Sequence, residues 1–155
     1  MTIILAEESH IPQIIDVWKE FMDYHRKLDS FFSRRDDGHL NFEKYIKELM
    51  KSNEAQVLVA LDEGNVVGYS IALLQYYPPV FKQRVHGLIN DMAIKETHRR
   101  RGIGEQLLSR MYEWFKYHRL DRIELRVSVN NQIGYSFWKK HGFEDYMHVL
   151  YLEKE

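Results

Sequence analysis

The residues best suited to chemistry lie in one short stretch of the 155-residue chain. Three arginines, Arg99 to Arg101, are followed by Gly102 and Gly104. Glycines let backbone N–H groups approach a ligand closely, and the beginning of a helix adds partial positive charge. The stretch therefore predicts a phosphate site held mainly by the backbone. The alternative is a solvent-exposed basic turn that merely begins a helix.

Two common phosphate-binding motifs do not match this stretch. A P-loop ends in Gly-Lys-Ser/Thr, whereas Gly104 is followed by Glu105 and Gln106. A dinucleotide-binding fingerprint needs a small residue at the position of Leu107. Neither nucleotide-binding class fits the sequence.

The elements that must position the basic stretch alternate between strands and helices. Hydrophobic periodicity predicts strands at residues 2–6, 57–61, 66–74, 88–94 and 123–127, and an edge strand at 149–152. It predicts helices at residues 40–50, 102–116 and 131–141, and a first helix capped by Ser9. Residues 26–39 are expected to form a polar loop, and residues 62–65 a hairpin turn.

The order of these elements predicts an α/β fold in one domain, residues 1–155. Hairpins come first, so the N-terminal strands should be antiparallel. The later strand–helix–strand unit, residues 88–127, predicts a parallel pair joined by a right-handed crossover.

Composition and charge exclude several function classes. The formal net charge is −1, which gives no global attraction to nucleic acid or to an anionic membrane. The absence of cysteine excludes disulfides, thiolate nucleophiles and cysteine-bound metals. No histidine pair has the i, i+4 spacing of a helical metal site, so no metal is expected. The chain has no basic, apolar leader and no apolar window of about 20 residues, so we expect a soluble, cytoplasmic protein.

The basic stretch resembles the cofactor loop of the GNAT superfamily of acetyl-CoA-dependent N-acetyltransferases, which reads Gln/Arg-x-x-Gly-x-Gly/Ala. Arg99, Gly102 and Gly104 match this pattern. Residues 91–94 resemble the bulged strand that precedes the loop in this family. The resemblance implies a mixed sheet with antiparallel N-terminal strands, a central parallel pair that splays apart, and flanking helices.

A second stretch extends the resemblance toward the C-terminus. Asn131 and residues 138–143 are similar to the family element Asn-(six residues)-Tyr-x-x-x-Gly-Phe. Together the two motifs cover residues 88–143, in the family's order and spacing.

The resemblance implies a set of contacts with acetyl-CoA. The backbone of Met92, Ala93 and Ile94 would pair with the pantetheine arm as an added strand would. The diphosphate would bind Arg99 and the amides of Arg100, Arg101, Gly102, Ile103, Gly104 and Glu105. Asn131 would contact the pantetheine arm, and Trp138 would complete the cofactor site.

The implied reaction is direct acetyl transfer to a primary amine, without an acetyl-enzyme. Deprotonating an alkylammonium at pH 7 costs about 4.6 kcal/mol, which a nearby carboxylate can help to supply. Asp91 is the first candidate for this base, because strand alternation places it on one face with Ile89 and Ala93. The alternative is a structural aspartate, and Glu124 is a second candidate base.

Two departures from the family pattern bear on mechanism and substrate. Trp138 stands where the family commonly has the tyrosine acid, so Tyr135, one helical turn earlier, is the replacement candidate. Its alternative role is packing under the last strand. Arg126 stands where the related ribosomal-protein N-terminal acetyltransferases have a glutamate.

This second departure favours a small-molecule amine such as a polyamine, an amino sugar or an amino acid. The acceptor pocket is expected between residues 27–37 and 76–81. Other hypotheses are a protein N-terminal or lysine acetyltransferase, a non-catalytic acyl-CoA sensor, and a nucleic-acid-binding domain. Dimers formed through a sheet edge are common in the family, which makes a homodimer an expectation. No nucleic-acid or membrane partner is expected.

Overall fold

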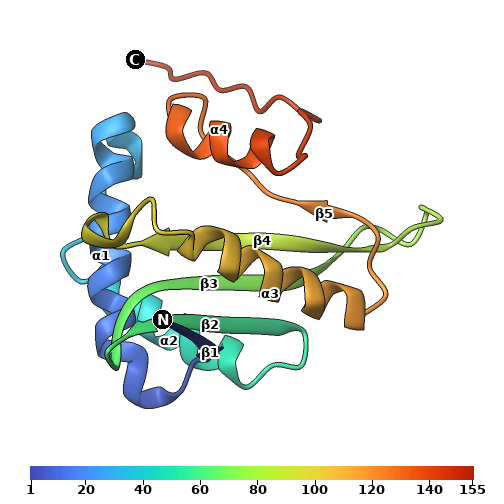
Figure 1. The fold of residues 1–155 in the computed structure, drawn as a ribbon. Helices are drawn as coiled ribbons and strands as arrows, with labels where there is room; N and C mark the ends of the chain where they lie inside the picture. Colours follow the sequence, from blue (N-terminus) through green and yellow to red (C-terminus); the bar gives the residue numbers. More distant parts are fainter.

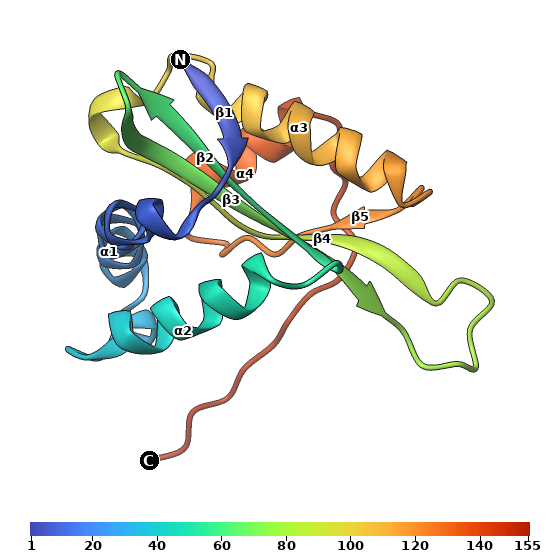
Figure 2. The same ribbon diagram turned by 90° about the horizontal axis from the view of Figure 1, so that it is seen from below.

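The computed structural model describes residues 1–155 and contains one five-stranded sheet with helices on both faces (Figures 1 and 2). The elements, in chain order, are β1 (Thr2–Leu5), η1 (Glu8–His10), α1 (Ile11–Leu28), η2 (Ser30–Phe32), α2 (Gly38–Met50), β2 (Ala55–Asp62), β3 (Asn65–Tyr76), β4 (Val85–Ile94), η3 (Glu96–His98), α3 (Ile103–Tyr117), β5 (Ile123–Glu124) and α4 (Gln132–Lys140).

The strands lie in the order β1-β2-β3-β4-β5. The first four strands pair with one another in antiparallel fashion, and β4 and β5 are parallel. This arrangement confirms the predicted fold class. It places the end of β4 and the beginning of α3, which hold the basic stretch, at one end of the sheet (Figure 1).

Two hydrophobic clusters fill the space on the two faces of the sheet. One packs α1 and α2 against the sheet and includes the stacked rings of Trp18 and Phe42, whose centroids lie 4.7 Å apart. The other packs α3 and part of α4 on the opposite face. There, Phe115 of α3 lies so close to β4 that a Cβ on Gly87 would approach its ring to 2.6 Å. Close packing of α3 therefore requires a glycine at this point of β4.

The hairpin between β2 and β3 forms as the sequence predicts. Its two turn residues, Glu63 and Gly64, have φ values of 51° and 82°. Two consecutive positive values are typical of the tight turn that matches strand twist.

The beginning and end of the first helix differ from the prediction. Ser9 lies in η1 and does not cap α1, because η1 leads directly into α1 and His10 occupies the N-cap position; the His10 ring accepts a 3.0 Å hydrogen bond from the Glu7 amide at the beginning of η1. Residues 26–28, predicted as loop, continue α1. Basic residues in a last helical turn interact favourably with the helix dipole, which explains the extension.

One predicted strand is shorter than expected and another does not form. β5 contains only Ile123 and Glu124, because β4 diverges and leaves residues 125–127 without a partner. Residues 149–152 form no strand; they are 80–89% exposed and no strand lies beside them. None of the helices combines the length and the apolar character needed to cross a membrane.

Candidate functional site

β4 contains a bulge immediately before the residues predicted to bind a cofactor. Ile71 of β3 pairs with Asp91, and Ala72 pairs with Ile89, which leaves Asn90 as the extra residue. A bulge reverses the side-chain alternation that follows it. Ile89 accordingly packs on the α3 face, whereas Asp91 contacts Tyr69 on the α1 and α2 face. The prediction that Asp91 and Ile89 share a face is therefore wrong, while Ala93 does lie on the Asp91 face.

Beyond the bulge, one edge of β4 has no strand partner. β5 pairs with β4 only at Gly87 and Leu88, and the chain after Glu124 leaves the sheet toward α4 (Figure 1). The β5-facing edge of residues 89–94, which includes Met92 and Ile94, is consequently free to pair with an extended ligand.

The turn between β4 and α3 exposes a run of unpaired backbone donors. None of the N–H groups of residues 100–105 donates a hydrogen bond within the protein; the first to do so is that of Gln106. The chain passes through left-handed backbone at Arg100 and Gly102, with φ of 61° and 77°. The last three of these donors belong to the first turn of α3, where the helix dipole is positive. This arrangement can bind a polyphosphate anion.

The side chains of this turn face in different directions. The guanidinium of Arg99 lies over the Tyr24 ring of α1, 5.4 Å from its centroid, and Arg100 and Arg101 are exposed. The Glu105 carboxylate pairs with Lys140 and His141 at the end of α4.

Gly104 is needed for helix packing as well as for access to the backbone. It is buried, and a Cβ there would lie 3.2 Å from the Phe137 ring and 3.4 Å from Met92. The small residue therefore lets α4 and β4 approach the beginning of α3.

Asp91 lies among aromatic side chains on the α1 and α2 face of β4. One carboxylate oxygen accepts a 2.9 Å hydrogen bond from the buried Tyr69 hydroxyl, and the other accepts a 3.1 Å bond from Asn90. Burial raises the pKa of the Asp91 carboxyl, although the bond from Tyr69 and the nearby His25 act to lower it. Burial also raises the pKa of Tyr45, and the charge of Asp91 adds to this effect. A carboxyl with a raised pKa, beside an uncovered strand edge, can act as a general base.

Asn131 links α4 to α1. Its side-chain oxygen caps α4 by accepting a 3.0 Å bond from the Gly134 amide, and it also accepts a 3.2 Å bond from the Tyr24 hydroxyl. Its amide nitrogen donates to no protein group and can serve a ligand.

A polar cavity of about 480 Å³ lies between α1 and the β4–α3 turn, and the sequence analysis missed it. Its lining residues are Glu20, Asp23, Tyr24, Lys27, Glu96 and Arg99. The signal was available, because the first four repeat at i, i+3, i+4 and i+7 and so form a polar stripe on α1. Amphipathic helices normally expose such a stripe, so periodicity alone assigns it to solvent.

Tyr135 and Trp138 lie on α4, and no contact joins either of them to Asp91. The Tyr135 hydroxyl donates to the Asp145 carboxylate at 2.9 Å. This hydrogen bond raises the pKa of the Tyr135 phenol. The Trp138 ring packs edge-on against Phe137 and Phe143, with centroids 4.9 and 5.4 Å away.

The two segments predicted to enclose an acceptor do not meet. Residues 27–37 begin in the last turn of α1, whereas residues 76–81 run from the end of β3 into its connection to β4, at the opposite end of the sheet (Figures 1 and 2). Only the first segment, through Lys27, reaches the polar cavity.

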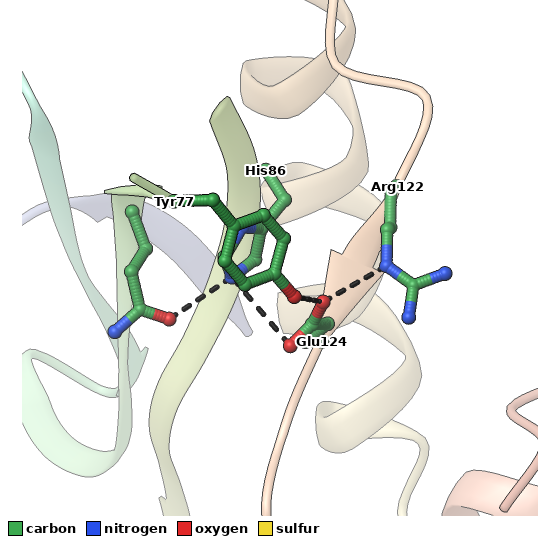
Figure 3. A network of polar contacts seen from close by, with 5 residues as sticks. Tyr77, His86, Arg122 and Glu124 are labelled. Atoms are coloured by element: carbon green, nitrogen blue, oxygen red, sulfur yellow. Dashed lines mark hydrogen bonds and ion pairs between the residues drawn. The ribbon is translucent and has the colours of Figure 1, made fainter. Parts of the chain in front are cut away.

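The closed end of the β4–β5 pair holds a second polar cluster (Figure 3). The Glu124 carboxylate accepts hydrogen bonds from Tyr77 and, at 2.8 Å, from Arg122. The buried His86 ring stacks on Tyr77, bonds to Gln75 at 2.9 Å and lies 3.6 Å from Glu124.

The charges in this cluster suit a structural role. Burial acts to raise the pKa of Glu124, but the hydrogen bonds from Tyr77 and Arg122 and the charges of His86 and Arg122 outweigh it, so the pKa is lowered. Because its carboxylate is committed to these donors, Glu124 is a weaker candidate base than Asp91.

Comparison with known proteins identifies the family. Residues 14–143 match the profile of the Acetyltransferase (GNAT) family. The L-amino acid N-acetyltransferase AaaT of Escherichia coli is 34% identical over 88 residues. That alignment covers 56% of this chain and 52% of the relative's own length, so the chain spans about half of that enzyme.

Solved structures share the fold over nearly the whole chain. The BH1408 protein of Bacillus halodurans, solved as a tetramutant, superposes with a TM-score of 0.90 at 25% identity; the match covers 99% of this chain and all of that one. An aminoglycoside 6'-N-acetyltransferase of Acinetobacter haemolyticus superposes with a TM-score of 0.79 at 17% identity, over 100% of this chain and 99% of its own. At that identity the likeness shows the fold alone.

Proposed function

The chain belongs to the Acetyltransferase (GNAT) family, and on that premise we propose that it transfers an acetyl group from acetyl-CoA to a primary amine of a small molecule. The observation that carries this proposal is the position of Asp91. Its partly buried carboxyl follows the bulge directly, at the point where the edge of β4 becomes free. A proton acceptor and an open strand edge therefore occur together on one strand.

Acetyl-CoA would supply an acetyl group activated as a thioester. Residues at the site are placed to bind its diphosphate and its pantetheine arm. The unpaired N–H groups of residues 100–105 would bind the diphosphate. The free edge of Met92, Ala93 and Ile94 would pair with the pantetheine arm, and the Asn131 amide would contact the same arm.

Asp91 would accept a proton from the acceptor ammonium, and the neutral nitrogen would then attack the thioester carbonyl carbon. The C–S bond breaks as the new C–N bond forms, the sulfur leaves as thiolate, and the second proton that the nitrogen loses on becoming an amide passes to that thiolate, directly or through water. A backbone N–H of the bulged strand, that of Met92, would donate to the carbonyl oxygen as its charge develops. No protein side chain carries the acetyl group, so transfer is direct.

No side chain is clearly placed to protonate the sulfur as it leaves. Tyr135 as the acid stays a prediction, because its hydroxyl is bonded to Asp145 and its pKa is raised. A thiol whose pKa is about 8.5 is an adequate leaving group as the thiolate, so a dedicated acid is not essential.

Two observations support a small cationic amine as the acceptor. The wall of the cavity beside Arg99 includes the carboxylates of Glu20, Asp23 and Glu96; Asp23 already pairs with Arg34 at 3.2 Å, so Glu20 and Glu96 are the acidic groups left for a cation. One relative is named as an L-amino acid N-acetyltransferase, and one structural neighbour as an aminoglycoside N-acetyltransferase. Both names give small amines as acceptors. We propose amino acids, amino sugars and polyamines as the classes to test first.

The test is free-thiol release from acetyl-CoA with a panel of these amines. We expect one equivalent of thiol for each equivalent of N-acetylated product, which mass spectrometry identifies. The proposal is overturned if no amine, at saturating acetyl-CoA, yields acetylated product above the uncatalysed rate.

A non-catalytic acyl-CoA sensor is a second candidate, favoured by the commitment of the Tyr135 hydroxyl to Asp145 and by Trp138 at the usual tyrosine position. It predicts that CoA raises the melting temperature while no amine releases thiol. Product formation with any amine excludes it.

A further inference from the structure

Helix α1 contacts both ends of η3, the short helix that leads from β4 into the turn before α3. At one end, the Glu20 carboxylate accepts a 2.6 Å hydrogen bond from the Glu96 amide. At the other end, the Arg99 guanidinium lies over the Tyr24 ring, 5.4 Å from its centroid. Glu20 and Tyr24 are one helical turn apart and so lie on one face of α1. The position of the turn therefore depends on α1, although α1 lies outside both sequence motifs of the family.

The same tyrosine also reaches the second motif. The Tyr24 hydroxyl donates a 3.2 Å hydrogen bond to the side-chain oxygen of Asn131. Next to it, the Asn130 side chain donates a 3.3 Å bond to the Leu28 carbonyl, so the end of α1 and the beginning of α4 are joined twice (Figure 1). Arg99 and Asn131 are far apart in the sequence, and Tyr24 contacts both.

The Tyr24 hydroxyl helps to fix which way the Asn131 amide faces. A side-chain amide has one acceptor oxygen and one donor nitrogen, which exchange places when the group rotates by half a turn. The Asn131 oxygen accepts from the Gly134 amide at 3.0 Å and from the Tyr24 hydroxyl at 3.2 Å. With both donors on the oxygen, the amide nitrogen is left free for a ligand.

The Tyr24 ring acts on Arg99 in a similar way. A guanidinium that lies over an aromatic ring is attracted through its flat face, which leaves its N–H groups free to donate to an anion. The ring therefore restricts the Arg99 side chain without using its hydrogen-bond donors.

We propose that Tyr24 is a positioning residue for the cofactor, because its ring holds Arg99 and its hydroxyl holds Asn131 before the cofactor binds. The inference rests on the proposed function, in which Arg99 binds the diphosphate and Asn131 binds the pantetheine arm. Side chains that are already held lose less conformational entropy on binding. Loss of Tyr24 should therefore weaken cofactor binding even without a direct contact. The alternative is that Tyr24 only holds α1 against α4.

The test measures CoA affinity by calorimetric titration. Tyr24→Phe keeps the ring and removes the hydroxyl, and we expect the Kd for CoA to rise about fivefold. Tyr24→Leu also removes the ring, and we expect a rise of about 20-fold. Circular dichroism verifies that each variant is folded.

Tyr77→Phe is the matched control. Like Tyr24, Tyr77 is half-buried and donates a hydrogen bond to a side-chain oxygen, that of Glu124 at the closed end of the β4–β5 pair. Loss of this bond should lower the melting temperature and leave the Kd for CoA unchanged.

A double-mutant cycle separates positioning from a general loss of stability. Asn131→Ser keeps a residue that can cap α4, but it removes the amide and the partner of the Tyr24 hydroxyl. In this background Tyr24→Phe should change the Kd for CoA by less than about 1.5-fold, because the hydroxyl acts through Asn131. With an amine that the panel identifies, Tyr24→Phe should raise the KM for acetyl-CoA and leave the KM for the amine unchanged.

The inference is overturned if Tyr24→Phe binds CoA as tightly as the wild type, or if it loses the same affinity in the Asn131→Ser background. It is also overturned if Tyr24→Leu binds no more weakly than Tyr24→Phe. Equal weakening in Tyr77→Phe would overturn it too, since affinity would then follow stability. A wild type that binds no CoA contradicts the proposed function instead, so the two failures are distinguishable.

Discussion

The two ends of the β4–β5 pair hold polar groups in opposite states. At the closed end, Glu124 accepts bonds from Tyr77 and Arg122, beside a buried His86. At the open end, the partly buried Asp91 has a pKa raised by desolvation, and six successive N–H groups, of residues 100–105, have no acceptor in the protein. Groups that are already paired hold the strands together, whereas groups left unpaired at a cost in stability remain available to a ligand.

The largest expected effect is a loss of activity on replacing Asp91 that does not occur on replacing Glu124. Asp91→Asn should lower kcat/KM at pH 7 by about 10²–10⁴-fold, because the proton acceptor is lost. Glu124→Gln, the matched control, should change kcat/KM by less than about threefold. The deficit of Asp91→Asn should shrink as pH rises toward the pKa of the amine, which a pH–rate profile measures. Equal losses in the two variants would return Asp91 to a structural role.

The second prediction concerns the turn that precedes α3. Gly102 and Gly64 both have positive φ, 77° and 82°, and a Cβ on either would meet nothing within 4 Å. Alanine at each position should cost about 1 kcal/mol of folding stability from backbone strain alone. Only Gly102→Ala should also weaken CoA binding, by about tenfold, because it shifts the neighbouring N–H donors. Calorimetric titration checks this, and equal affinities for the two variants would contradict the assignment of the turn.

The third prediction compares the same two variants by their stability, where we expect the larger loss in Glu124→Gln. Glu124→Gln should lower the free energy of unfolding by about 1–2 kcal/mol, since it weakens the bonds from Tyr77 and Arg122. Asp91→Asn should be at least as stable as the wild type at pH 7. A raised pKa means that the ionised Asp91 destabilises the fold above its ordinary pKa, and the neutral amide removes that cost. Urea unfolding at pH 7 measures both variants.

The smallest expected effect is a pH dependence at the closed end. Burial lowers the pKa of His86, although Glu124 acts against it. A lowered histidine pKa means that folding disfavours the proton, so stability is present above the unfolded pKa of about 6.5 and is lost as pH falls below it. The melting temperature of the wild type should therefore fall more steeply between pH 7 and 5 than that of His86→Gln. Parallel curves would show that the His86 proton is not linked to folding.

The sequence predicted the turn and its neighbours because their signals are local. The two glycines, the arginines and the hydrophobic stripe of α3 occur within a few residues, and each constrains backbone that lies beside it. The same holds for the Glu63–Gly64 hairpin. Alternation failed at Asp91, because the extra residue Asn90 becomes a bulge only through pairing with β3.

The proposed acceptor site was less predictable from the sequence, since distant segments form its cavity. The polar cavity joins α1 to the β4–α3 turn, and the stripe from Glu20 to Lys27 is indistinguishable in sequence from an exposed helix face. Residues 76–81 were expected to form the acceptor pocket together with residues 27–37, but the length of the β3–β4 hairpin carries them to the far end of the sheet (Figure 2).

By itself, the sequence determined the fold class, the basic glycine-containing turn before α3 and the family, because these depend on periodicity and on short motifs. Only the tertiary structure decided which face Asp91 occupies, that the Glu124 carboxylate already accepts hydrogen bonds from Tyr77 and Arg122, and that residues 149–152 form no strand. The physical reason is that hydrogen bonding, burial and strand pairing join residues far apart in sequence, and one chain read in order does not show which groups will meet.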